Sequence, residues 1–263
     1  MSRLTWCVAA LNAWFNIPEG TPLFDGKKII CIAPCYNELH KIDKVVARIR
    51  AAAVVDEILV VDDGSTDGSP ATARALGATV IALGKTCGVG VAIRTGIEHG
   101  VANNFDIVVI IAGNNKDEPK EIAKLVYPLT REGYDFVQGS RFMEGGHYGG
   151  EMPLYRKLAT RIHPLLFSLV SGKRVTDSTN GFRAFKASLF QDKRMNIWQE
   201  WLNEYELEPY LYYKAIKLGY KTTEVPVTKI YPPKKLGYTK MRPITGWWSI
   251  LRPLFLLGFG IRK

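Results

Sequence analysis

The feature that most constrains this chain is a run of apolar residues that ends in two acidic ones. Residues 58–61 are Ile-Leu-Val-Val, a pattern typical of a strand that is buried on both faces. Asp62 and Asp63 follow at once, and residues 64–69 form a loop of mostly small residues that leads into a predicted helix. Ligands of open parallel sheets bind at the carboxyl ends of strands, where such loops meet. The two carboxylates therefore indicate either a ligand site or a turn that Asp62 caps, with Asp63 in solvent.

Strand and helix patterns alternate along the first half of the chain. Apolar runs predict further strands over 28–33, 79–82, 106–111 and 136–138, with amphipathic segments between them. Strands that are joined through helices pair in parallel. We therefore expect a single α/β domain whose mostly parallel central sheet is flanked by helices.

A glycine-rich segment over residues 145–150 separates the two halves of the chain. Its composition predicts a mobile loop over a site, or a plain connector. Beyond it we expect helices over 154–170 and 205–218 and a closing strand over 221–227. The first of these helices has apolar residues along one side: Leu158, Ile162, Leu165, Leu166 and Leu169.

The charge of the chain favours anionic partners. Its 263 residues carry a formal net charge of +10, which would attract nucleotide diphosphates or a phospholipid surface. No run of Lys and Arg is long enough to indicate a nucleic-acid arm, so we expect no nucleic-acid partner. The four cysteines lack the spacing of a zinc site or a disulfide framework. This usage predicts a protein of the reducing cytoplasm.

The two ends of the chain differ from its centre. Residues 1–26 predict a short arm without the pattern of a secretory signal, and residues 27–230 predict the α/β domain. Residues 231–263 are rich in Trp, Leu, Phe, Lys and Arg. This composition predicts either a segment in the membrane interface or a helix docked on the protein's own core. No apolar run is long enough to span a bilayer.

Five polar segments have to be interpreted together, namely residues 34–38, 62–65, 112–119, 139–142 and 177–183. Most of them directly follow predicted strands, so their loops lie at one edge of a parallel sheet. Their carboxylate, amide and guanidinium groups suit a nucleotide diphosphate, with polar groups for base and ribose and cations for phosphates. The residues that we expect to share this crevice are Glu38, Asp62, Asp63, Asn114, Asp117, Arg141, Asp177 and Arg183.

The order of these segments resembles family 2 glycosyltransferases with the GT-A fold. The segments Pro-Cys-Tyr-Asn-Glu (34–38), Asp-Asp-Gly-Ser (62–65), Gly-Ser-Arg (139–141) and Asn-Gly-Phe-Arg (180–183) are similar to those of polyprenyl- and dolichol-phosphate sugar transferases. The resemblance covers roughly residues 27–227. It implies a GT-A domain with a Rossmann-like nucleotide-binding half, and an inverting transfer of sugar from a nucleotide-diphosphate sugar.

The resemblance also implies roles for individual residues. Asp177 and Arg183 would lie by the sugar and the acceptor, and Arg141 would meet phosphate. A phosphate acceptor needs no strong base, whereas for a hydroxyl acceptor Asp177, Glu206 or Glu208 would serve as general base. The implied nucleotide-sugar site comprises Pro34, Tyr36, Glu38, Asp62, Asp63, Gly113, Asn114 and Lys116.

The chain departs from the family at the loop after the fourth predicted strand. The family usually has Asp-x-Asp there, which binds Mg²⁺ or Mn²⁺, whereas this chain has Ala112-Gly113-Asn114. Loss of both carboxylates weakens the attraction for a hard divalent cation. Two outcomes stay open. Asn114 and Asp117 hold a weaker metal site, or Lys116 and Arg141 neutralise the diphosphate directly without a metal.

The aromatic and basic C-terminal segment would bring the crevice to a membrane surface. We therefore expect a lipid-phosphate or lipid-linked acceptor at the cytoplasmic face of a membrane. Two alternatives remain open. One is a transferase that acts on a soluble or polysaccharide hydroxyl, and the other is a nucleotide-sugar binder without catalysis.

Overall fold

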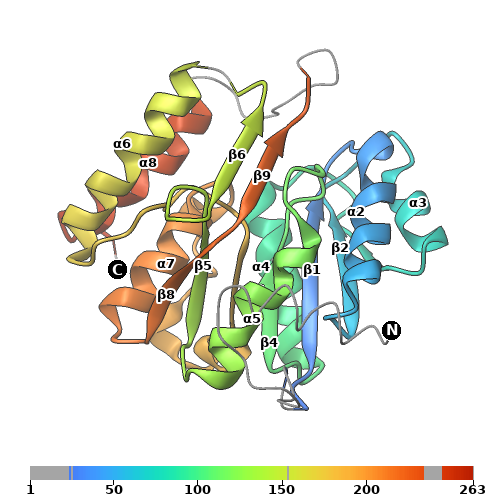
Figure 1. Ribbon diagram of the computed structural model, residues 1–263, viewed down its shortest axis with the longest axis horizontal. Helices are drawn as coiled ribbons and strands as arrows, with labels where there is room; N and C mark the ends of the chain where they lie inside the picture. Colours follow the sequence, from blue (N-terminus) through green and yellow to red (C-terminus); the bar gives the residue numbers. More distant parts are fainter. Residues whose placement is uncertain (1–23, 25, 153, 234–244, 263) are drawn as a thin grey trace.

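The computed structural model describes residues 24, 26–152, 154–233 and 245–262. Almost all of the expected N-terminal arm, and the basic stretch over 234–242, lie outside the described residues. The centre is a seven-stranded sheet with the order β3-β2-β1-β4-β7-β5-β8 (Figure 1). Its strands are β1 (Ile29–Cys35), β2 (Glu57–Asp62), β3 (Thr79–Ala82), β4 (Ile107–Ile110), β5 (Phe136–Ser140), β7 (Arg183–Lys186) and β8 (Thr222–Pro226). All neighbours pair in parallel except β7, which is antiparallel to β4 and β5.

Helices cover both faces of this sheet. The core on one face includes residues of α2 (Leu39–Ala52), α3 (Ser69–Ala75) and α5 (Ile122–Arg131). The core on the other face includes residues of α4 (Val89–Ala102), α6 (Leu154–Ser171), α7 (Leu207–Lys217) and α8 (Thr245–Gly258). Short 3₁₀ turns lie at Pro119–Glu121, Ala187–Gln191, Lys193–Met195 and Glu200–Leu202.

Strand β1 shows how the apolar runs produce this layering. Successive side chains of a strand point to opposite faces. Cys31 and Ala33 pack under α2 and α5, whereas Ile30 and Ile32 pack under α4. The expected α/β architecture with a mostly parallel sheet is therefore confirmed, and each of the six predicted strands is present with its ends shifted by at most two residues.

The glycine-rich segment differs from our expectation of a mobile loop, and that expectation was wrong. His147–Gly150 forms β6, which pairs in parallel with β9 (Thr228–Tyr231) beside the main sheet. Gly150 has a φ of +78°, and a Cβ on it would lie 1.9 Å from the backbone oxygen of Tyr231. Glycine is used at this position because the two strands approach too closely for a side chain.

Helices α6 and α8 lie side by side at one end of the molecule (Figure 1). The buried His163 of α6 joins them, since its Nε2 lies 3.2 Å from the backbone oxygen of Ile250. The apolar side of α6 faces solvent rather than the core, with Leu154, Leu158, Leu165 and Leu169 all more than 60% exposed. In the described part of the chain we find no helix with the length and apolar character needed to cross a bilayer.

Helix α8 has two different faces. Ile250, Leu254 and Leu257 pack against the protein, whereas Trp248 and Phe255 are about half exposed. The helix therefore docks on the protein's own core, which was one of the two alternatives, and it also exposes two aromatic side chains. The segment in the membrane interface, the other alternative, stays a prediction.

Candidate active site

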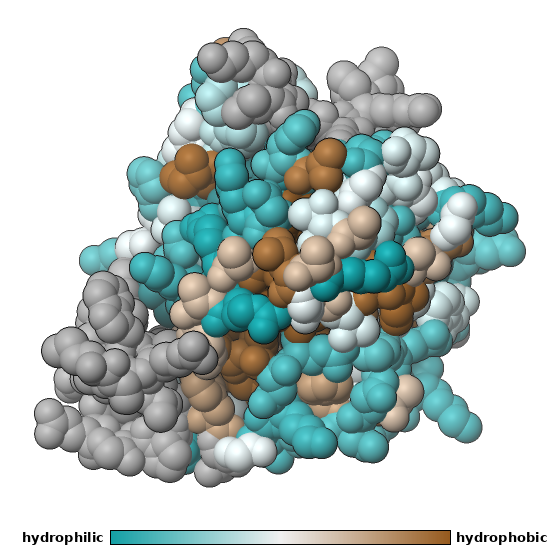
Figure 2. Space-filling view, turned by 90° about the vertical axis from the view of Figure 1, so that its right-hand side faces the viewer, coloured by the Kyte–Doolittle hydropathy of each residue, from teal (hydrophilic) through white to brown (hydrophobic). Residues whose placement is uncertain are grey.

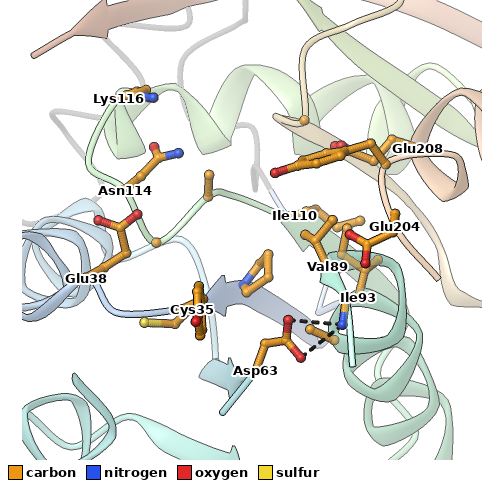
Figure 3. A pocket seen from close by; sticks show the side chains of 18 of the residues that line it. Cys35, Glu38, Asp63, Val89, Ile93, Ile110, Asn114, Lys116, Glu204 and Glu208 are labelled. Carbon is orange, nitrogen blue, oxygen red and sulfur yellow. Dashed lines mark hydrogen bonds between the residues drawn. The ribbon is translucent and has the colours of Figure 1, made fainter. Parts of the chain in front are cut away.

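A cleft of about 1130 Å³ opens at the carboxyl edge of the sheet. Its walls come from the ends of β1, β2 and β4, the starts of α4 and α7, and the first turns of α8. Glu38, Asn114 and Lys116 lie on one side of the opening, and Glu204 and Glu208 lie on the other (Figure 3). Segments that are far apart in the sequence therefore meet at one site.

Most of the expected site residues line this cleft. Asp62, Asp117, Asp177 and Arg183 do not, although we expected them in the shared crevice. Their side chains are almost completely buried, and each one contacts other groups of the chain. The expected residues that do line the cleft are Pro34, Tyr36, Glu38, Asp63, Gly113, Asn114, Lys116 and Arg141.

Asp63 lies at the floor of the cleft, one residue beyond β2. Its carboxylate accepts a hydrogen bond from the backbone N–H of Cys87 at 2.6 Å. It also accepts from the backbone N–H of Gly88 at 3.1 Å, just ahead of α4 (dashed lines in Figure 3). Burial raises the pKa of Asp63, although these N–H groups act to lower it. The neighbouring Asp62 turns away and accepts from the backbone N–H of Ser65 at 3.1 Å. Asp62 therefore caps the turn, as the simpler of the two interpretations held. That interpretation was wrong about Asp63, which is only 6% exposed rather than in solvent.

Two glycines at the start of α4 bring a distant segment to the cleft. A Cβ on Gly90 would lie 2.1 Å from the backbone oxygen of Leu202, and one on Gly88 would lie 2.3 Å from that of Asn203. This close approach lets the Gly90 N–H donate to the Asn203 oxygen at 2.8 Å. The contact holds Glu204 at the wall of the cleft. Sequence reasoning missed Glu204 because the packing of two segments far apart in the chain brings it there.

Lys116, in the loop after β4, is only 6% exposed and lines the cleft. Burial first, and then the positive charges of Arg156, Lys229 and Lys41, lower its pKa to about 7, against the opposing effect of Glu38. The lining contains all four of these neighbours. Sequence reasoning missed Arg156 and Lys229, which come from α6 and β9.

The residues of this loop do not fit a divalent metal site. Asp117, which we considered as a ligand with Asn114, lies outside the cleft, and its Oδ1 accepts from the Lys229 Nζ at 2.6 Å. The Asn114 Oδ1 is buried without a hydrogen-bond partner among the described residues, but one amide oxygen is a weak ligand set. Within the described chain, no cluster of three or more His, Cys, Asp or Glu side chains could hold a metal ion.

Arg141 and Asp177 form a buried pair at the end of β5. Arg141 donates to both carboxylate oxygens of Asp177, at 2.7 and 2.8 Å. Burial alone would raise the pKa of Asp177, but the Arg141 charge and its hydrogen bonds hold that pKa below the ordinary value. Asp177 is fully buried, so its side chain orients Arg141 rather than facing the cleft as we expected.

Arg183 is fully buried as well, although the resemblance placed it by the acceptor. Its guanidinium donates to the backbone oxygens of Glu208 (2.7 Å) and Asn180. Burial lowers its pKa. Arg183 thus holds the start of α7, where Glu208 lines the cleft. Glu206, another candidate base, does not line it and accepts from Arg252 of α8 at 2.7 Å.

Several characterised proteins are similar to this chain. Glycosyltransferase AglJ of Haloferax volcanii is 32% identical over 227 residues, which cover 86% of this chain and 71% of that protein. Dolichyl-phosphate hexose transferase of the same organism is 30% identical, over 82% of this chain and 87% of its own. Undecaprenyl-phosphate mannosyltransferase of Micrococcus luteus is 27% identical, over 81% and 87%.

A solved structure confirms the expected fold. Glucosyl-3-phosphoglycerate synthase from Mycobacterium tuberculosis, crystallised with Mn²⁺, uridine diphosphate and glucosyl-3-phosphoglycerate, superposes with a TM-score of 0.66. The match covers 94% of this chain and 87% of that one at 21% identity. This likeness shows the fold alone, which is the GT-A architecture.

The family assignment rests on a direct sequence match. The sequence profile described as glycosyl transferase family 2 matches residues 30–193, which include the loops after β1, β2, β4 and β5. Because this match spans more than half of the chain, the protein belongs to glycosyl transferase family 2 and is a glycosyltransferase.

Proposed function

We propose that this glycosyltransferase transfers a sugar, with inversion, from a nucleotide-diphosphate sugar to a lipid phosphate at the cytoplasmic face of a membrane. The observation that carries the proposal is a single cleft that has a carboxylate at its floor, cations on one wall and the exposed apolar surface of α6 and α8 beside it. Two of the relatives named above carry dolichyl-phosphate or undecaprenyl-phosphate in their names. The third carries the general name glycosyltransferase.

The donor would lie across the carboxyl edge of the sheet. Asp63 and Glu38 offer carboxylate oxygens to the hydroxyl and N–H groups of a nucleoside, and Tyr36, 38% exposed, offers a ring for the base. Lys116 and Arg141 lie where they can face negative charge. Carboxylates for the nucleoside and cations for the phosphates are the groups that such a ligand requires.

The lipid acceptor would approach along α6 and α8. The exposed leucines of α6 recur at helical spacing, and α8 adds the half-exposed Trp248 and Phe255. Basic residues flank this apolar surface, among them Lys157 and Arg161. Apolar residues with flanking lysine and arginine are typical of helices that lie in the interface of an anionic membrane. The α2 and α3 side of the molecule differs, since hydrophilic and hydrophobic residues are interspersed over it (Figure 2).

The same helix connects this surface to the cleft. Gly246, Ser249 and Ile250 of α8 line the cleft, while Trp248 on the same turn is exposed. A lipid bound along α8 would therefore present its phosphate at the mouth of the cleft. This continuity favours a lipid-phosphate acceptor over a soluble one.

A transfer assay tests this function. Purified enzyme would be incubated with a panel of labelled nucleotide sugars and with polyprenyl phosphate in anionic liposomes. We expect label in the lipid fraction with at least one donor. Absence of lipid-linked label with every donor, despite nucleotide binding, would refute the proposal.

A flotation assay tests the membrane surface separately. Leu158→Glu and Leu165→Glu on α6 should each reduce binding to anionic liposomes. The matched control is Leu76→Glu, which changes an exposed leucine (38%) that follows α3. If the α6 variants float as well as the control does, α6 is not the membrane contact.

A hydroxyl acceptor is the second candidate function, and one observation favours it. Glu204 and Glu208 both line the cleft and are correctly placed carboxylates for a general base. A phosphate acceptor requires no such base. Transfer to a soluble hydroxyl that is lost in Glu208→Gln, without transfer to lipid phosphate, would favour this alternative.

A further inference from the structure

Three cations surround Tyr231 at the end of β9. The Lys116 Nζ lies 5.4 Å from the centre of its ring, and the Arg156 guanidinium carbon lies 5.5 Å from it. The Tyr231 hydroxyl accepts a hydrogen bond from Arg141 at 2.9 Å. Tyr231 itself is 1% exposed, whereas all three cations line the cleft. The ring is therefore a buried support that holds positive charge at one wall.

These cations differ in how much of their donor capacity the chain already uses. Arg141 donates through Nε, Nη1 and Nη2 to Asp177, Tyr231 and Thr179, so its guanidinium is largely occupied. The Arg156 Nε is buried and donates to no acceptor among the described residues. A buried donor without an acceptor is costly, and a ligand oxygen would remove that cost. This unused donor belongs to a residue whose positive charge also acts on Lys116.

Lys229 completes the group from the same strand as Tyr231. It lines the cleft and donates to Asp117 (2.6 Å) and to the Asn180 Oδ1 (3.0 Å). The carboxylate of Asp117, which stands three residues beyond Asn114, thus holds a cation. At the position where the family carries metal-binding carboxylates, this chain gathers positive side chains instead.

We propose that Lys116, Arg156 and Lys229, supported by Tyr231, form the binding site for the donor's diphosphate and take the place of a divalent metal ion. We call these four residues the diphosphate site. The inference rests on the proposed function for the identity of the donor. It assigns Tyr231 as a positioning residue, because its buried ring supports the cations and does not line the cleft. Arg141 lines the cleft beside this site, where Asp177 and Tyr231 hold it.

The charges of the reaction agree with this site. When the bond between the anomeric carbon and the diphosphate oxygen breaks, its electron pair stays on the diphosphate, which gains one negative charge. An oxygen of the acceptor phosphate forms the new bond to carbon and loses one negative charge, and no proton is transferred. Fixed cations beside the departing diphosphate stabilise the charge that develops there. Arginine and lysine clamps perform this task in other phosphate chemistry.

Binding measurements without catalysis test the site directly. Calorimetry would measure the affinity of the enzyme for uridine diphosphate, guanosine diphosphate and inorganic pyrophosphate, in EDTA and in excess Mg²⁺. Inorganic pyrophosphate lacks a base, so it reports on the diphosphate site alone. We expect the wild-type affinity for the best nucleoside diphosphate to differ less than about threefold between EDTA and Mg²⁺, because the side-chain cations are present in both buffers. Loss of a charged contact that binding requires would cost more than this.

The variants Lys116→Met and Arg156→Met should each weaken diphosphate binding by about 10- to 100-fold, the effect of losing one hydrogen bond to a charged group. The matched control is Lys157→Met, which removes an exposed cation one residue from Arg156 that does not line the cleft. Thermal unfolding of each variant verifies folding. The Lys116→Met variant should keep the stability of the wild type, because the substitution removes a buried charge. The variant Arg156→Lys should bind diphosphate more tightly than Arg156→Met does, because it keeps a positive charge.

The outcomes separate this inference from the proposed function. If EDTA abolishes diphosphate binding and Mg²⁺ restores it, a metal is required and the inference is overturned, whereas the transferase function stands. Losses in Lys116→Met and Arg156→Met no larger than in Lys157→Met would also overturn it. If diphosphates bind in EDTA but no sugar is transferred in either buffer, the proposed function fails and the diphosphate site remains.

Discussion

The two ends of the cleft use acidic residues in opposite ways. At the end of β2, Asp63 lines the cleft itself and is held there by backbone N–H groups. Beyond β4 and β5, Asp117 and Asp177 face away from the cleft, and each binds a cation that lines it, Lys229 or Arg141. The Asp63 end therefore presents a carboxylate that N–H groups hold, whereas cations line the other end together with Glu38.

The comparison shows that an acidic residue near a site need not contact the ligand. A buried carboxylate that is paired with a cation fixes where that cation points, and the cation then does the binding. The resemblance to the family placed Asp177 by the sugar and the acceptor, and Asp117 was a candidate metal ligand with Asn114. Their contacts assign them to the support of Arg141 and Lys229.

Asp177→Asn should produce the largest loss of stability. It leaves the buried Arg141 charge without its carboxylate, and breaking such a pair costs about 3–5 kcal/mol in the free energy of unfolding. Chemical denaturation measures this cost. The control Lys27→Met breaks the exposed pair of Lys27 with Asp106 and should change stability by less than about 1 kcal/mol. Equal, small effects of both variants would mean that the Asp177 pair does not organise the cation end.

Asp63→Ala should weaken nucleoside binding by about 10- to 100-fold, because hydrogen bonds to a charged group contribute about 1.5–3 kcal/mol. The neighbouring Asp62→Ala is the matched control, since Asp62 holds the turn and does not line the cleft. It should lower stability by about 1 kcal/mol and leave affinity unchanged. Calorimetry together with thermal unfolding separates the two effects. If Asp62→Ala lost the affinity for the nucleoside and Asp63→Ala kept it, Asp62 and not Asp63 would be the nucleoside-binding residue.

The affinity for nucleoside diphosphate should decrease as the pH rises above about 7, the pKa of Lys116. Below that pH Lys116 is already charged. Above it the anion must bind together with a proton, so the affinity falls by up to about tenfold per pH unit until the raised pKa of the complex is reached. The charged and titratable groups that face Lys116 are Arg156, Lys229, Lys41, Glu38 and Tyr231.

Lys116→Arg is the control for this pH dependence. Arginine keeps its charge throughout the range, so the affinity of this variant should stay level between about pH 7 and pH 9. Titrations of both proteins at several pH values provide the comparison. An identical decrease in Lys116→Arg would assign the pH dependence to a different group.

Much of the fold followed from the sequence. The apolar runs that became β1, β2 and β4 were recognisable because strands buried on both faces have few polar positions. The edge strand β3 is only partly buried, but its short apolar run was still recognisable. Strand β7, Arg183–Lys186, was missed. It is four residues long, begins with a charged residue and pairs antiparallel to both neighbours. Strands β6 and β9 were missed because glycines, which usually mark loops, allow their close pairing.

The site was predictable only in part, for a physical reason. Asp63, Asn114 and Lys116 directly follow strands, so the sheet alone brings them to one edge. Arg156 and Glu204 come from a helix and from a loop whose positions depend on tertiary packing. No local pattern separates the lining Glu208 from Glu206, which pairs with Arg252. Burial of Asp177 and Arg183 likewise depends on their partners and not on their motifs.

The central claim is that one cleft binds the nucleoside at its Asp63 end and the diphosphate at its Lys116 end. The most direct test is calorimetry of Asp63→Ala and Lys116→Met with a nucleoside and with the corresponding nucleoside diphosphate. We predict that Asp63→Ala weakens both ligands, whereas Lys116→Met weakens the diphosphate and leaves the nucleoside unchanged. Equal losses of both ligands in both variants would contradict the claim.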